Sequence, residues 1–113
     1  MKNYDIVKDK IMNELLYLGY DISLVGTKYL LEIIYIVLKN KHLMDDLNLK
    51  GKIYPVLAKK HNKNINDIKC SINYATTKMF YRCIIERNKK YLHIYDNEKP
   101  SSKTIIYMII NKI

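Results

Sequence analysis

Residues that interrupt helices are scarce in this chain, which contains 3 glycines and 2 prolines among its 113 residues. A fold of many short strands needs frequent turns, and glycine and proline supply most of the residues that turns require. The segments between these residues instead repeat apolar side chains at intervals of three and four, which is the period of an amphipathic helix. The sequence therefore predicts an all-α fold, and its length fits a single domain over residues 1–113.

The expected helices follow from the apolar positions and from the residues that begin or end a helix. Gly19 is expected to end the first helix, and Thr27 to cap the second. Apolar residues nearly surround the second helix, which predicts that it lies at the centre of the core. Residues 88–100 are expected to form a polar loop before an isoleucine-rich last helix. The expected helices cover residues 4–18, 27–40, 55–61, 65–87 and 102–113, with one or two helical turns within 42–50.

The stretch YPVLAKKHNKNINDIKC, residues 54–70, predicts a short helix, a turn and a longer helix. Pro55 suits the first position of the short helix, where its missing N–H costs nothing. Asn64 suits the N-cap of the longer helix, and Ala58 is small enough for the point where the two helices cross. The apolar residues behind this crossing are Leu57, Ile65, Ile68 and Ile72. The pattern predicts a helix-turn-helix at about residues 54–78, although a helical hairpin that touches no DNA would share it.

In a helix-turn-helix the second helix lies in the major groove of double-stranded DNA. Residues 65–80 are therefore the expected recognition helix, and the helical period turns its polar residues outward. Asparagine can pair with adenine and lysine can reach guanine, while flanking lysines can contact phosphates. The candidate base-reading residues are Asn66, Lys69, Cys70, Asn73, Tyr74 and Thr77. The candidate phosphate contacts are Lys59, Lys60, Lys63 and Lys78.

The charge balance agrees with a nucleic-acid partner without establishing one. The formal net charge is +9, from 20 Lys and Arg against 11 Asp and Glu. A small basic domain commonly binds a polyanion, because phosphate neutralisation releases counterions. The chain is also rich in asparagine, isoleucine and tyrosine, a bias typical of AT-rich coding sequences. Part of the lysine excess is therefore attributed to codon usage.

No pattern of residues indicates catalysis, a cofactor or a metal ion. Cys70 and Cys83 form no metal-binding motif, and His42, His61 and His93 are scattered with no carboxylate at ligand spacing. Three glycines provide no glycine-rich phosphate loop. We therefore expect no enzyme activity, no cofactor and no metal site.

A cytoplasmic location is expected from the same composition. Two cysteines give no disulfide framework of the kind that small secreted domains use. The N-terminus has no apolar signal core. The most apolar run, residues 29–38, is too short to cross a membrane and contains Glu32.

Four segments of the chain carry a resemblance to a known family: IMNELLYLG at residues 11–19, GTKYLLEII at 26–34, IYPVLAKKHN at 53–62 and KPSSKTIIYM at 99–108. They resemble segments of the C-terminal DNA-binding (effector) domain of the master response regulator of sporulation, the sporulation initiation transcription factor family. The resemblance extends from residue 11 to residue 113. Its most specific element is YP-x-x-A-K-K-x-N, which IYPVLAKKHN shares with the family pattern LY-P-x-I-A-K-K-[FY]-N, and KPSSKTIIYM is similar to K-P-T-N-S-x-F-I-x-M.

The resemblance implies an all-α domain of about six helices, a helix-turn-helix DNA-binding domain of the winged-helix-like, response-regulator effector type. It also implies binding to a short AT-rich promoter box and dimer contacts by the last helix. The family's recognition helix carries R-V-E-R-A-I-R-H where this chain has DIKCSINY, residues 67–74. This segment keeps Ile72 but none of the arginines, so we expect a changed site preference.

Two hypotheses from different classes remain. The first is a stand-alone transcription regulator related to sporulation, without a receiver domain, that binds double-stranded DNA sequence-specifically. The second is a protein-interaction module that antagonises a full-length sporulation regulator by forming mixed dimers, without specific DNA reading. The last helix is either a core helix or a dimer helix, and RNA polymerase is a further candidate partner. The candidate dimer contacts are Ile105, Ile109 and Ile110.

Overall fold

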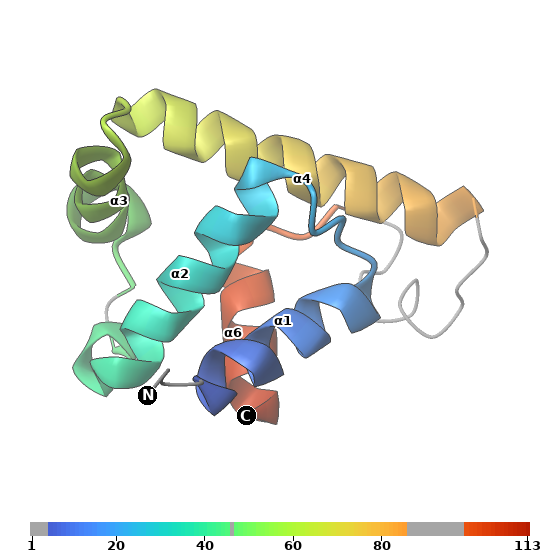
Figure 1. Cartoon of the computed structure of the whole chain (residues 1–113), viewed down its shortest axis with the longest axis horizontal. Coiled ribbons are helices and arrows are strands. Elements are labelled where there is room, and N and C mark those ends of the chain that lie inside the picture. The colour runs from blue at the N-terminus through green and yellow to red at the C-terminus, as the bar shows by residue number, and fades with distance from the viewer. Residues whose placement is uncertain (1–4, 46, 86–98) are drawn as a thin grey trace.

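The computed structural model of the chain is a bundle of α-helices in which α4 extends along one side and α1, α2 and α6 lie beside it (Figure 1). It describes residues 5–45, 47–85 and 99–113, with no side-chain detail at residues 83–85. No strand occurs among these residues, so the predicted all-α fold is confirmed. The α-helices are α1 (Ile6–Leu18), α2 (Val25–Lys39), α3 (Tyr54–His61), α4 (Ile65–Ile85) and α6 (Ser102–Lys112). Lys41–Met44 form a 3-10 turn and Leu49–Ile53 a π-helical turn, which overlap the expected region 42–50 and extend to residue 53.

Most helix ends lie where local chemistry predicts them. Gly19 ends α1 in the left-handed conformation, with φ 107°. Asn64 caps α4, because its Oδ1 accepts a hydrogen bond of 2.7 Å from the backbone N–H of Asp67. Ser101 caps α6 in the same way, accepting from the N–H of Thr104 at 3.2 Å. These caps satisfy N–H groups that the first turn of a helix leaves without partners.

The predicted cap of the second helix is wrong. Helix α2 begins at Val25, two residues before Thr27, and its N-cap residue Leu24 makes no side-chain cap bond. Thr27 is fully buried, and its hydroxyl donates to the carbonyl oxygen of Asp21 at 2.7 Å. The threonine therefore fastens the α1–α2 connection to the helix.

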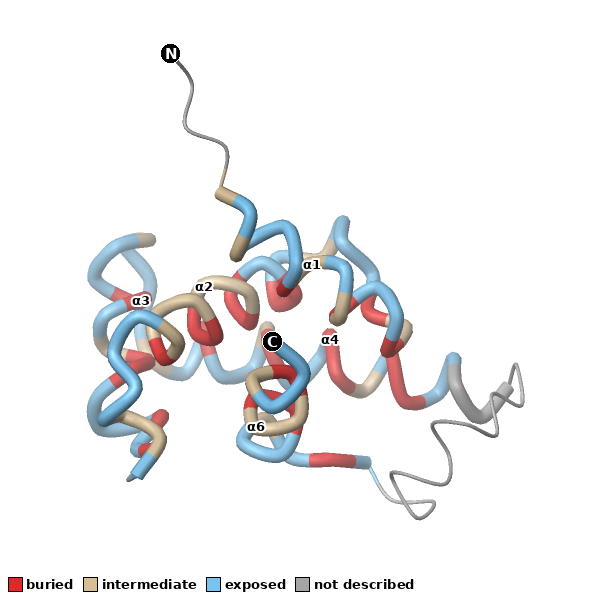
Figure 2. The backbone as a smooth tube through the Cα atoms, turned by 90° about the horizontal axis from the view of Figure 1, so that it is seen from below, coloured by how far each residue is buried: buried red, intermediate tan, exposed pale blue. Residues whose placement is uncertain are grey.

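Helix α2 is the centre of the core, as its apolar composition predicts. Leu30, Ile33, Ile34 and Val37 are completely buried, and the buried faces of α1, α4 and α6 surround this helix (Figures 1 and 2). Over residues 65–82, the buried residues of α4 are Ile68, Ile72, Ala75, Thr76, Met79 and Phe80. One long helix thus has an apolar face toward α2 and an opposite face toward solvent.

The sequence left two alternatives for the last helix, a core helix or a dimer helix, and α6 is a core helix. Ile105 and Ile109 are 0% and 1% exposed, so these two predicted dimer contacts are buried within the chain itself. Ile110 is half-buried and packs against the edge of the same core. The prediction of a dimer surface built on Ile105 and Ile109 is therefore corrected.

Helices α2 and α4 cross at unusually close range. A Cβ atom placed on the buried Gly26 would lie 1.9 Å from the carbonyl oxygen of Ser71 and 3.0 Å from the Cβ of Ala75. Only glycine fits there, because the obstacle is backbone. This contact fixes the position of α4 against α2.

Some sequence predictions fall outside the described residues. They are the end of the fourth helix at residue 87, the loop at residues 88–98 and His93, together with the side chain of Cys83. Within the described parts of the chain, no helix is long and apolar enough to cross a membrane. The same parts contain no group of three or more His, Cys, Asp or Glu residues that could hold a metal ion.

Candidate nucleic-acid interface

Helices α3 and α4 pack together across a three-residue turn, residues 62–64. The turn reverses direction at Asn62, whose φ of 55° and ψ of 48° are left-handed. Asparagine adopts this conformation more readily than most residues. The N–H of Lys63 donates to the carbonyl oxygen of Ala58 at 2.9 Å and closes the end of α3. This arrangement is a helix-turn-helix with the buried Ala58 on its first helix.

The predicted base-reading residues share the face of α4 that turns away from the core. Five of them are exposed, and Thr77 is half-buried. The opposite face carries Ile68, Ile72 and Met79, of which none is more than 1% exposed. The exposed five are Asn66, Lys69, Cys70, Asn73 and Tyr74. The residues on this outward face are thus available to a ligand without disturbing the core.

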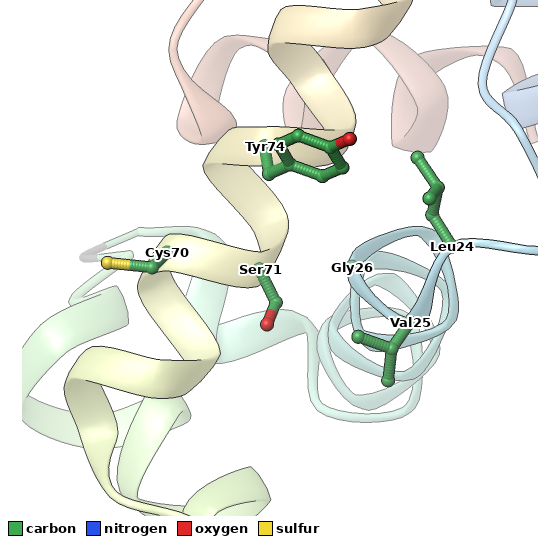
Figure 3. Close-up of a pocket in the computed structure, with 6 residues that line it drawn as sticks. All are labelled: Leu24, Val25, Gly26, Cys70, Ser71 and Tyr74. Atoms are coloured by element: carbon green, nitrogen blue, oxygen red, sulfur yellow. The ribbon is translucent and has the colours of Figure 1, made fainter.

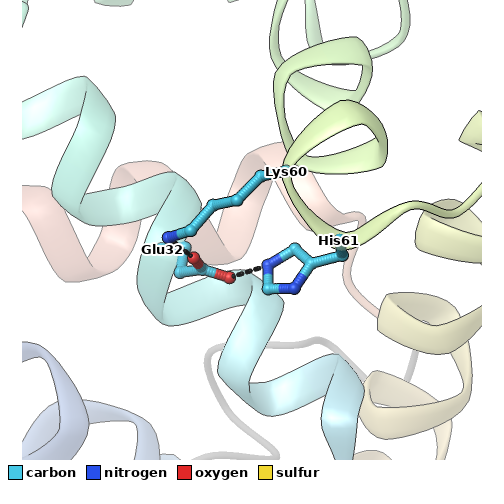
Figure 4. A network of polar contacts seen from close by, with 3 residues as sticks. All are labelled: Glu32, Lys60 and His61. Carbon is cyan, nitrogen blue, oxygen red and sulfur yellow. Dashed lines mark hydrogen bonds and ion pairs between the residues drawn. The ribbon is translucent and has the colours of Figure 1, made fainter.

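The four predicted phosphate contacts are all exposed, but two of them already have a partner within the chain. Lys78 places its Nζ over the ring of Tyr74, 5.9 Å from the centroid. Lys60 forms an ion pair with Glu32 of α2, and its side chain is 63% exposed (Figure 4). His61 shares the same carboxylate, with 2.7 Å between its Nε2 and Oε2 of Glu32. The imidazole also stacks at a tilt on Tyr29, with 5.0 Å between ring centroids. The end of α3 is therefore fastened to α2 by a charged contact.

The state of Glu32 follows from its surroundings. Burial raises the pKa of Glu32, but hydrogen bonds and charges from Lys60 and His61 outweigh this effect and hold the pKa below the ordinary 4.5. The carboxylate is consequently ionised at neutral pH. It accepts from two residues at the end of the first helix of the helix-turn-helix.

Lys99, which sequence analysis did not select, also reaches α4. Its Nζ donates to Oδ1 of Asn73 at 2.8 Å and to Oγ1 of Thr77 at 3.2 Å. Residue 99 precedes α6 and lies far along the chain from α4, so no local spacing indicates the contact. Only the packing of α6 against the rest of the core places this lysine beside two predicted base-reading residues.

An apolar hollow of about 330 Å³ lies where the start of α2 meets α4 (Figure 3). Val25 and Tyr74 face it from the two helices and are 49% and 55% exposed. Cys70 and Ser71 complete the α4 side, and Leu24 and Gly26 the α2 side. The exposed Val25 is a second residue that sequence analysis did not select, since a single apolar residue in a buried helix gives no distinguishing signal.

These features define the class of the molecule. A helical domain with a helix-turn-helix, an outward polar face on its second helix and lysines around that face is a helix-turn-helix DNA-binding domain. The chain belongs to the family described as sporulation initiation factor Spo0A C terminal, whose model matches residues 11–113. Among curated proteins and among solved structures, no significant match is found.

The family confirms the resemblance seen in the sequence and the broad function it implies. The chain is a DNA-binding domain of transcription regulation in sporulation. The family is one of transcription factors and not of enzymes.

Proposed function

We propose that this protein binds double-stranded DNA sequence-specifically and places residues 65–80 of α4 in the major groove. The observation that carries the proposal is the division of α4 into a buried apolar face and an outward polar face. An α-helix with its side chains is about 10–12 Å across, and the major groove of B-DNA is about 12 Å wide. The outward face can therefore enter the groove while the opposite face keeps its contacts with α2.

The lysines lie on both sides of this reading segment. Lys59 and Lys63 are exposed near the start of α4, and Lys78 is exposed near the end of the proposed reading segment. Phosphate contacts at the two ends would hold the helix in register along the groove. The ion pair with Glu32 offsets the positive charge of Lys60. We therefore expect Lys60 to contribute less to phosphate binding than the other three lysines.

The exposed side chains offer distinct base contacts. Asn66 can pair with adenine and Lys69 can donate to guanine. Tyr74 and Val25, on the two sides of the apolar hollow, can contact the methyl group of a thymine. The family's recognition helix carries arginines that residues 67–74 of this chain lack. We therefore expect the chain to prefer a DNA site that differs from the family's.

The alternative function, an interaction module that forms mixed dimers through its last helix, has less support. Ile105 and Ile109 were expected to make those contacts, and both are buried in the chain's own core. A dimer through α6 would need other residues of that helix.

Selection from a random duplex pool tests the proposal. The chain is titrated by fluorescence anisotropy at two salt concentrations, and bound duplexes are sequenced. We expect an enriched motif that is lost in the Lys69→Ala/Asn73→Ala variant and kept in Lys10→Ala, which changes an exposed lysine of α1. Salt-dependent binding with no enriched motif would contradict sequence-specific reading, because it would leave only the electrostatic attraction of a basic surface.

A further inference from the structure

We propose that Lys99 is a base-contacting residue that acts with Asn73 to select a guanine in the bound duplex. The inference rests on the proposed docking of α4 in the major groove. The inference adds Lys99, which lies outside the helix-turn-helix, to the base-reading residues. It also changes the base that Asn73 is expected to contact from adenine to guanine.

The contact is a small network on the outward side of α4. Lys99 Nζ lies 2.8 Å from Asn73 Oδ1 and 3.2 Å from Thr77 Oγ1. The hydroxyl of Thr77 donates its own proton to the backbone carbonyl of Asn73 at 2.8 Å. Its oxygen is therefore free to accept from the ammonium, so both acceptors face Lys99 in a consistent pattern.

The backbone next to Lys99 is held in place. Pro100 is buried, and Ser101 caps α6 by accepting from the N–H of Thr104. The isoleucines of α6 anchor that helix in the core. The lysine consequently starts from a fixed point, and its flexible side chain extends over α4.

Hydrogen-bond chemistry decides which base this network fits. An ammonium group has three N–H donors, and two of those of Lys99 point to Asn73 and Thr77. Asn73 Oδ1 accepts from the lysine, so the NH₂ group is what the amide of Asn73 has left to offer a base. The network therefore presents donors from both residues, and its ligand must present acceptors.

Guanine is the base that matches an array of donors in the major groove. It presents two acceptors there, N7 and O6. Adenine presents a donor beside its acceptor, cytosine presents a donor, and thymine presents a single acceptor with a methyl group. An asparagine alone would favour adenine, but the ammonium beside Asn73 would oppose the adenine N6 amino group. Guanine is thus preferred over adenine at this position.

The position of the ammonium argues for a base contact over a phosphate contact. Asn73 and Thr77 lie within the proposed reading segment, whereas Lys63 and Lys78 lie at its ends. Within residues 65–77, the sequence contains one lysine, Lys69, and no arginine. Lys99 therefore brings a second positive charge to the part of the helix that faces the bases.

The test compares sequence preference in Lys99→Met, Lys99→Arg and a matched control, Lys103→Met, which changes an exposed lysine of α6. We expect the unmodified chain to select a G·C pair at one position of its motif. Lys99→Met should reduce discrimination at that position by roughly 10-fold to 100-fold, the range of one good base contact. Lys99→Arg should retain it, Asn73→Ala should relax the same position, and Lys103→Met should change nothing.

Other outcomes would overturn the inference. A uniform loss of affinity for all sequences in Lys99→Met, with a salt dependence lower by about one phosphate contact, would make Lys99 a phosphate ligand. Unchanged binding would mean that Lys99 does not contact DNA and only links the segment before α6 to α4. If the unmodified chain selects no motif, the proposed function itself fails, and that result is distinct from a motif that survives Lys99→Met. Thermal melting of each variant checks that this exposed side chain does not affect folding.

Discussion

Gly26 is the residue on which the position of α4 most directly depends. In Gly26→Ala the new methyl group would meet the carbonyl of Ser71 at 1.9 Å, so α2 and α4 would have to separate. We expect a loss of about 1–3 kcal/mol in the free energy of unfolding, or more if the helices cannot adjust, measured by urea denaturation.

Gly51→Ala is the matched control for this prediction. A Cβ on Gly51 would meet the side chain of Asn48 at 2.5 Å, and this exposed side chain can move aside. The cost is limited to the one hydrogen bond that Asn48 Oδ1 accepts from the N–H of Gly51 at 2.9 Å. Its loss should be clearly smaller than that of Gly26→Ala. Equal losses would mean that the α2–α4 contact is no tighter than an exposed turn.

At the scale of single residues, the sequence predicts what local chemistry decides. Gly19 and Asn64 end and begin helices through bonds to neighbouring residues, and both predictions are confirmed. Thr27 was expected to cap a helix, but its hydroxyl bonds to the preceding connection. The close fit of Gly26 and the reach of Lys99 depend on residues about 45 and 26 positions away, so no local pattern reveals them.

At the scale of elements, the contact of Glu32 with Lys60 and His61 joins α3 to α2. The pKa of Glu32 is lowered in the folded chain, so its ionised form stabilises folding above the unfolded value of 4.5. This stabilisation should decrease as the pH falls from 5 to 3 and the carboxylate takes up a proton. In Glu32→Gln we expect stability to be lower by about 1 kcal/mol at pH 5, with a weaker decline toward pH 3.

Urea unfolding at several pH values between 5 and 3 measures this difference. Glu14→Gln is the control, since Glu14 has no ion pair among the described residues. The idea would be refuted if the gap between the unmodified chain and Glu32→Gln stayed constant over that pH range.

The helical period predicted which face of each element is apolar, but not what covers that face. For α4 the period placed most of the predicted base-reading residues on the exposed face, and what binds that face stays a prediction. For α6 the period was not sufficient, because an isoleucine stripe is the same whether it packs on the chain's own core or on a second copy. Ile105 and Ile109 were therefore placed on the correct face and given the wrong partner.

At the scale of the whole molecule, the net charge is +9, but we do not expect every lysine to contribute equally to DNA binding. Each phosphate neutralised by a lysine contributes about 0.9 to the slope of log affinity against log salt concentration. We expect Lys63→Gln to lower the magnitude of that slope by about this amount. Lys60→Gln should lower it by much less, because Glu32 already balances its charge. Anisotropy titrations over a salt series measure both slopes, and equal decreases would show that DNA draws Lys60 away from Glu32.

Whether the folded unit is one chain or two is tested through α6. Ile109 is 1% exposed within a single chain, so Ile109→Ala should cost about 2–5 kcal/mol by leaving a cavity in the core. Ile110→Ala, at the half-buried neighbouring position, should cost less.

The same experiment, repeated at two protein concentrations, separates a core helix from a dimer helix. A helix that folds onto its own chain gives a urea midpoint that does not depend on concentration, in the unmodified chain and in both variants. A helix that needs a second copy gives a midpoint that rises with concentration, because association stabilises only the folded state. We expect the first result, since the isoleucines that a dimer would share are already covered by α2 and its neighbours. A concentration-dependent midpoint that Ile109→Ala abolishes would instead restore the dimer helix and with it the case for mixed dimers.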